Sequence, residues 1–150
     1  MIVIGLAMPM PGFAADGPAV IVIVNTEQPS DELSVEDVAR IYQGLKTRWA
    51  DGSQIISINR SPTSPIRAAF YRLVLNEGPM KEFYQLGSPV PFKTMAQQSP
   101  ASAKRLVAHM PNAISYILLD ELDDTVKALA INGVAPTPEN VRTKRYPLCE

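Results

Sequence analysis

The sequence of 150 residues predicts one α/β domain in which crossover helices cover a central sheet. The first observation is a continuous apolar run at 19–25, the pattern of a strand buried on both faces. The second is that strand patterns alternate with helical patterns along the rest of the chain. The third is length, since a chain of this size buries about two-thirds of the surface that it exposes when unfolded. No internal repeat or linker divides the chain.

The first helix is expected to begin after Ser34 and to end at Gly44. Ser34 is a typical N-cap, and a glycine often ends a helix because it adopts a left-handed conformation without strain. The apolar stripe of this helix consists of Val38, Ile41 and Tyr42. Trp49, in the loop that follows, is expected to anchor that loop by packing rather than to stack on a ligand.

The remaining elements follow in an order that fits a layered domain. They are a strand at 54–59, a helix at 65–76, a short helix at 79–86, a loop at 88–98, a helix at 99–110, a strand at 113–119, an acidic turn at 120–124, a half-buried strand at 126–131 and a last short helix from Thr137. The acidic turn lacks the alternating ligands of a calcium loop, so we interpret it as solvated.

The segment 60–67 joins the strand at 54–59 to the next helix and is the best candidate site. Ser64 is expected to cap the helix, with Pro65 at the first helical position. Such a turn gathers backbone N–H groups, hydroxyls and the positive end of the helix dipole. Arg67 adds a guanidinium that suits phosphate or carboxylate. The pattern indicates an anion site, although many Ser-Pro helix starts bind nothing.

Several functions are disfavoured by composition. The formal net charge is −1 and no basic block is present, so nucleic acid is not an expected partner. His109 and Cys149 are the single histidine and cysteine, which makes a metal site or a cofactor unexpected. The anion site lacks a general base, so we expect no catalytic residues and a binding protein rather than an enzyme.

The first 15 residues are apolar and end in small residues, which resembles the end of a secretory signal peptide. The positive start of such a leader is missing, so we expect either a truncated leader or an internal methionine at Met1. An ordinary N-terminal strand is the alternative. On the first interpretation, residues 16–150 form the mature domain, which is periplasmic or secreted and has no membrane span.

Four segments resemble, in order and spacing, the phosphate-binding components of ABC transporters. Residues 33–49 resemble a helix followed by Gly-Lys-x-Thr-x-Trp, and 60–70 are in register with the phosphate loop Arg-x-x-Gly-Ser-Gly-Thr-Arg-x-x-Phe. Residues 111–117 resemble Pro-Gly-Ala-Ile-Gly-Tyr-Val, and 126–148 resemble the C-terminal stretch. The match extends over about 22–148 and implies one lobe of a type II periplasmic-binding-protein fold, a mixed sheet flanked by helices.

The resemblance implies a solute-binding protein for phosphate or a similar oxyanion, with an ABC permease as partner. Ser64 and Arg67 match the serine and the arginine of the phosphate loop, and Arg60, Ser61 and Thr63 are further candidate ligands.

The phosphate loop departs from the family pattern in two donors. Pro65 stands where the pattern has a glycine and Ile66 where it has a threonine, so one N–H and one hydroxyl are lost. The alternative function is therefore a single-lobe interaction or sensory module that has lost ligand binding, and self-association remains open.

Overall fold

The computed structural model describes residues 18–150, and the predicted leader at 1–15 lies outside them. The strands are β1 (Val20–Val24), β2 (Glu32–Leu33), β3 (Ile56–Arg60), β4 (Phe83–Tyr84), β5 (Pro91–Phe92), β6 (Met95–Gln97), β7 (Ala113–Leu118), β8 (Lys127–Ala128) and β9 (Ala130–Ile131). The helices are α1 (Val35–Tyr42), α2 (Pro65–Phe70), α3 (Pro100–His109) and α4 (Pro138–Arg142), with a π-helical turn η1 (Tyr71–Leu75) and a 3-10 turn η2 (Leu119–Glu121).

The main sheet has five strands in the order β6-β3-β7-β1-β8. It is mixed, because β3 is parallel to β6 and β7 whereas β1 is antiparallel to β7 and β8. Every residue of β1 is buried, as its uninterrupted apolar run predicts. The predicted α/β class with a mixed sheet flanked by helices is therefore confirmed.

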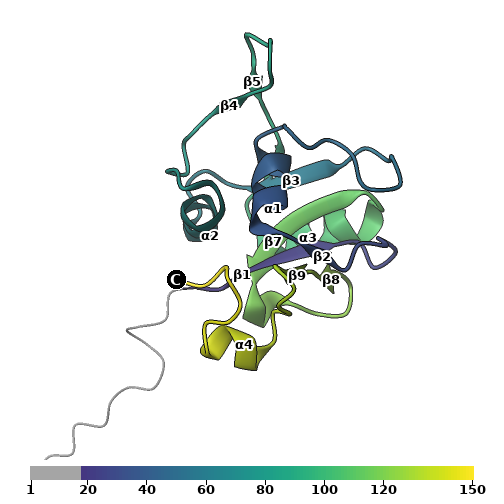
Figure 1. The fold of residues 1–150 in the computed structure, drawn as a ribbon, viewed down its shortest axis with the longest axis vertical. Helices are drawn as coiled ribbons and strands as arrows, with labels where there is room; N and C mark the ends of the chain where they lie inside the picture. The colour runs from purple at the N-terminus through teal and green to yellow at the C-terminus, as the bar shows by residue number, and fades with distance from the viewer. Residues whose placement is uncertain (1–17) are drawn as a thin grey trace, which may run out of the picture.

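Helices cover both faces of the sheet, with α1 in front and α3 behind in the view of Figure 1. On the α1 face, Phe70 stacks on Tyr116 of β7 with ring centroids 3.9 Å apart, and Tyr42 meets Phe70 edge-on at 4.8 Å. Aromatic packing of this kind adds to the free energy gained by burying the rings. It fixes α1 and α2 against the strands next to the candidate site.

Three predicted helix starts are confirmed in detail. The hydroxyl of Ser34 accepts a hydrogen bond from the N–H of Asp37 at 3.0 Å, and Ser99 accepts one from Ser102 at 3.1 Å. Thr137 caps α4 in the same way. Each side chain satisfies a backbone donor that has no partner within its helix.

The predicted short helix at 79–86 is wrong, and so is the predicted loop at 88–98. The structure has a turn at 79–80 and then a β4–β5 hairpin, after which β6 joins the main sheet beside β3. The hairpin extends beyond the sheet at the top of Figure 1. Phe83 and Phe92 pair across it, so they form a cross-strand pair rather than one side of a helix.

Two further elements differ from the prediction. The expected strand at 126–131 is divided between β8, which pairs with β1, and β9, which pairs with β2. The helix predicted at 65–76 widens into the π-helical turn η1 after Phe70. Trp49 packs in the core as expected, and its indole N–H donates to Asn112 O at 3.0 Å.

The C-terminal end of the chain returns to the beginning of β1 (Figure 1). The N–H of Val20 donates to Leu148 O at 2.8 Å, and the Tyr146 hydroxyl donates to Val20 O at 2.7 Å. Both Tyr146 and Leu148 are buried. These contacts close the domain around the strand that lies at its centre.

Candidate functional site

The turn from β3 to α2 brings the predicted hydroxyl residues together at the start of the helix. Ser64 is the N-cap residue, but its hydroxyl and its N–H both donate to Ser61 O, at 2.7 and 2.9 Å. The hydroxyls of Ser61 and Thr63 lie 3.2 Å apart at the surface. Ser64 therefore shapes the turn through its donors, while the hydroxyls of Ser61 and Thr63 face solvent.

Donors for an anion remain in the first turn of α2. Ile66 and Arg67 have N–H groups with no acceptor inside the helix, as is general for first-turn residues. Pro65 contributes none. The turn thus offers fewer backbone donors than a glycine-rich anion nest would.

The guanidinium of Arg67 is held by backbone carbonyls. Its Nε donates to Pro79 O at 2.9 Å and its Nη1 donates to Arg60 O at 3.0 Å. The group also lies over the ring of Tyr71, 4.7 Å from the centroid. These three contacts fix the orientation of the positive charge without neutralising it, and Nη2 is left to bind a ligand.

Arg60, the last residue of β3, is 3% exposed. Its Nη1 donates to Tyr116 O at 3.2 Å and its Nε donates to Gln97 O at 3.4 Å, so the side chain bridges β7 and β6. Burial lowers the pKa of this guanidinium, and the negative charge of Glu121 acts in the opposite direction. Arg60 contributes a buried positive charge behind the turn.

Neither arginine forms an ion pair within residues 18–150, whereas six other cationic side chains there do. A buried or half-buried cation without a carboxylate is unfavourable unless another group compensates it. The structure therefore places two positive charges without a directly paired carboxylate at the turn from β3 to α2, although Glu121 acts on Arg60 from a distance, and this arrangement favours an anion.

A cavity of about 260 Å³ lies beside this turn, between α2 and the β4–β5 hairpin. We call it the hairpin cavity. Arg67 and Tyr71 line it from the helix, and Asn59 lines it from β3. Its apolar lining is completed by Met80, Phe83, Pro91 and Phe92, and its charged lining by Lys81, Glu82 and Lys93.

Of the five predicted site residues, Arg67 alone lines the hairpin cavity. The residues of the hairpin were missed, because the pattern at 79–86 predicts a helix. Asn59 was missed as well; its Nδ2 donates to the Tyr71 hydroxyl at 3.0 Å, and its Oδ1 accepts from Tyr116. The signal for Asn59 is an amide near the end of a predicted strand, directly before the turn of the candidate site.

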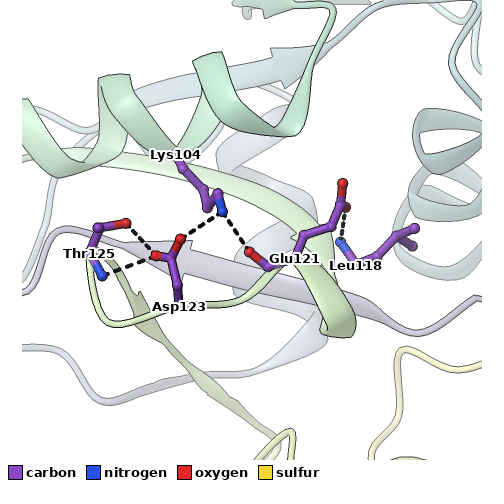
Figure 2. Close-up of polar contacts among 5 residues, drawn as sticks. All are labelled: Lys104, Leu118, Glu121, Asp123 and Thr125. Atoms are coloured by element: carbon purple, nitrogen blue, oxygen red, sulfur yellow. Dashed lines mark hydrogen bonds and ion pairs between the residues drawn. The ribbon is translucent and has the colours of Figure 1, made fainter.

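The acidic segment at 120–124 has a structural role (Figure 2). Lys104 of α3 donates to Glu121 O at 2.8 Å and to Asp123 Oδ2 at 2.7 Å, and Asp123 Oδ1 accepts from the N–H of Thr125 at 3.0 Å. Glu121 accepts from the N–H of Leu118. Lys104 therefore fastens α3 to the segment of the chain that follows β7.

Within residues 18–150, no three His, Cys, Asp or Glu side chains converge on a point where a metal ion could bind. In the same part of the chain, no helix has the length and apolar character needed to cross a bilayer.

Comparison with known proteins gives a consistent result. The model of a PBP superfamily domain matches residues 17–150. The phosphate-binding protein PstS of Bacillus subtilis (strain 168) is 29% identical over 130 residues, an alignment that covers 83% of this chain and 40% of that protein.

Solved structures of similar fold are about twice as long as the aligned part of this chain. A protein of Clostridium perfringens described as a phosphate ABC transporter substrate-binding protein, solved with bound phosphate, has a TM-score of 0.74 and 28% identity, and the match covers 89% of this chain and 53% of that one. An ABC-type phosphate transport receptor of Vibrio cholerae has a TM-score of 0.74 at 23% identity, with 88% and 53% covered. The chain thus spans about half of each receptor.

Proposed function

The chain belongs to the PBP superfamily, and we propose that it is an extracytoplasmic solute-binding protein for phosphate or a similar oxyanion, acting with an ABC permease. The B. subtilis relative is a phosphate-binding protein, and the C. perfringens structure contains phosphate. These relatives are binding and transport proteins rather than enzymes. The chain spans 40% of the first of them, so its own ligand and partner are part of the proposal.

The observation that carries this proposal is the state of Arg67. Its guanidinium is oriented by two carbonyls and by the Tyr71 ring, lines the hairpin cavity and has no carboxylate partner among the described residues. An anion at this point would receive a charge-assisted bond from Arg67, which belongs to the first turn of α2, where the free N–H groups of the helix also lie.

The remaining ligands of the proposed site are weaker. Ser61 and Thr63 offer hydroxyls at the surface, and Arg60 adds a buried charge behind the turn. Ser64 would act mainly by holding the turn, since its donors are directed at Ser61 O. We therefore expect an affinity below that of a loop with a complete glycine nest.

Calorimetric titration of the protein with phosphate, and separately with sulfate, tests the proposal. Arg67→Ala should weaken phosphate binding at least tenfold, because one charge-assisted bond contributes about 1.5–3 kcal/mol. Arg72→Ala is the matched control, since Arg72 lies five residues further along the same helical segment and pairs with Glu150. No saturable heat with either anion, from protein shown to be folded, would contradict the proposal.

The alternative is a single-lobe interaction module, and the tip of the hairpin favours it. Leu86 is 100% exposed and Val90 is 63% exposed, which is unusual for apolar side chains so close together. If this tip mediates self-association, sedimentation will show a concentration-dependent dimer that Leu86→Lys abolishes. A monomer at all concentrations would contradict that reading.

A further inference from the structure

The hairpin cavity is larger and less polar than a bare tetrahedral oxyanion requires. Its volume of about 260 Å³ lies just below the range of roughly 300–1,000 Å³ typical of pockets for small organic ligands. We propose that the ligand of this site is an organic phosphate, with its phosphoryl group at Arg67 and its apolar substituent against the β4–β5 hairpin. This inference rests on the proposed function, because both place the anion at Arg67.

The wall opposite β3 is apolar and partly aromatic. Phe83 of β4 packs against Tyr71 with ring centroids 6.3 Å apart and planes tilted by 48°, and Phe92 lines the cavity from β5. Met80, 71% exposed, completes this wall. An inorganic anion gains nothing from such surfaces, because losing its hydration next to them is unfavourable. An apolar substituent would instead be stabilised by its burial there.

The positive charges of the cavity are arranged to suit one anionic group. Arg67 is fixed beside the turn, whereas Lys81 and Lys93 are exposed side chains of the lining. Glu82 is the one carboxylate among the lining residues. Lys81 is also 4.0 Å from Glu77, so it is the weaker of the two exposed cations. The lining therefore has a net positive charge, and a ligand of opposite charge and apolar body matches both of its features.

The position of the hairpin depends on a contact with the turn that follows α1. The ring of Phe92 packs directly on Gly44, where a Cβ atom would come within 2.7 Å of Phe92 Cγ, and Gln85 Nε2 donates to Gly44 O at 3.5 Å. This contact holds the apolar wall at a fixed distance from Arg67. The cavity is therefore present before a ligand arrives, which lowers the entropy cost of binding.

Calorimetric titration with phenyl phosphate, inorganic phosphate and phenol tests the inference. Phenyl phosphate should bind at least tenfold more tightly than inorganic phosphate, and phenol should not bind measurably. Phe83→Ala should lower the affinity for phenyl phosphate about fivefold and leave that for inorganic phosphate unchanged. Met80→Ala, at an exposed position where folding is not at risk, should lower it about threefold. Leu86→Ala, at the tip of the same hairpin, is the matched control and should change neither affinity.

The outcomes separate this inference from the proposed function. Phosphate binding that needs Arg67, combined with equal or weaker binding of phenyl phosphate, would overturn the inference and leave the proposed function standing. Binding of phenyl phosphate alone, lost in Arg67→Ala, would support the inference and exclude inorganic phosphate as the ligand. If Phe83→Ala and Met80→Ala weaken the binding of phenyl phosphate and of inorganic phosphate by the same factor, the inference is also overturned, because the apolar wall would then act on the phosphate group itself. Binding of neither anion would contradict both.

Discussion

Pro65 is the residue that most limits the anion site, because it occupies the first position of α2 without an N–H group. Pro65→Ala restores that donor while keeping a good helix former at the position. We expect phosphate to bind about tenfold more tightly, since one further charge-assisted bond contributes about 1.5–3 kcal/mol. Titration of Pro65→Ala beside Pro100→Ala, the same change at the start of α3, measures the effect. An equal gain in both variants, or no gain in either, would count against an anion at α2.

At the residue scale, the sequence is informative where a local rule sets the geometry. The N-cap position of Ser64 and the place of Arg67 in the first turn follow from local chain order, and the structure has both. What Ser64 does with its hydroxyl does not follow, because the turn supplies a nearer acceptor, Ser61 O. The burial of Arg60 likewise depends on β6 and β7, which are distant in sequence.

Gly44, in the turn after α1, is the point where that turn contacts the β4–β5 hairpin. Its φ of +75° already disfavours a side chain, and a Cβ atom would overlap the ring of Phe92. We expect Gly44→Ala to lower the free energy of unfolding by about 2 kcal/mol, of which roughly 1–2 kcal/mol comes from the backbone alone. Gly52→Ala is the control, because Gly52 has a φ of +87° and no atom within 4 Å of an added Cβ.

Denaturant unfolding of both glycine variants measures the difference. A greater loss in Gly44→Ala than in Gly52→Ala isolates the packing of Phe92, and Gly44→Ala should also weaken binding of phenyl phosphate. If both variants lose the same free energy of unfolding, the hairpin does not depend on the contact between Phe92 and Gly44.

The contact between α3 and the segment 120–125 makes stability depend on pH. Donation from Lys104, followed by that from Thr125, lowers the pKa of Asp123 from 3.8 to about 2. Because the pKa is lower in the folded state, the stabilisation is complete above about 4 and is lost as the pH falls through about 2. Asp123→Asn should therefore flatten the dependence of stability on pH between these values.

Thermal unfolding from pH 2 to pH 7 checks this prediction, with Asp124→Asn as the control that removes the same charge one residue away. The contribution is expected to be small, since the carboxylate is exposed to solvent. A pH profile of Asp123→Asn identical to that of the unchanged protein would contradict the assignment.

At the element scale, strongly patterned segments are predictable and short strands are not. The apolar run of β1 and the caps of α1 and α3 are confirmed. The segment 79–98 is mispredicted, because β4 and β5 have two residues each and β6 has three, too few to show alternation. Their pairing comes from tertiary contacts, with the Phe83–Phe92 pair and the edge of β3.

Closure of the whole domain depends on the return of the C-terminal segment to β1. Tyr146→Phe removes the hydrogen bond from the Tyr146 hydroxyl to Val20 O and keeps the buried ring. We expect the free energy of unfolding to fall by about 1 kcal/mol. Tyr84→Phe, at an exposed position of the hairpin, should have no effect in the same denaturant titration. If the two variants have the same free energy of unfolding, the hydrogen bond from Tyr146 to Val20 contributes little to the stability of the domain.

For the whole molecule, the order of elements predicts an α/β domain but does not give its strand order. The placing of β1 between β7 and β8 brings together residues 90 to 105 positions apart in the sequence. Such pairings are set by the burial of the sheet as a whole, so a local sequence pattern cannot predict them. The resemblance to phosphate-binding proteins, rather than periodicity, supplied the single-lobe architecture.

The central claim is that an anion binds at the turn between β3 and α2. The most direct test is a titration of ¹⁵N-labelled protein with phosphate, followed by NMR. The account predicts that the largest shifts occur at the amides of Ile66 and Arg67 and at Arg67 Nε, and that residues of α4 stay unchanged. Shifts centred elsewhere, or none at a phosphate concentration of tens of millimolar, well above the roughly 1 mM dissociation constant of a weak site, would contradict it.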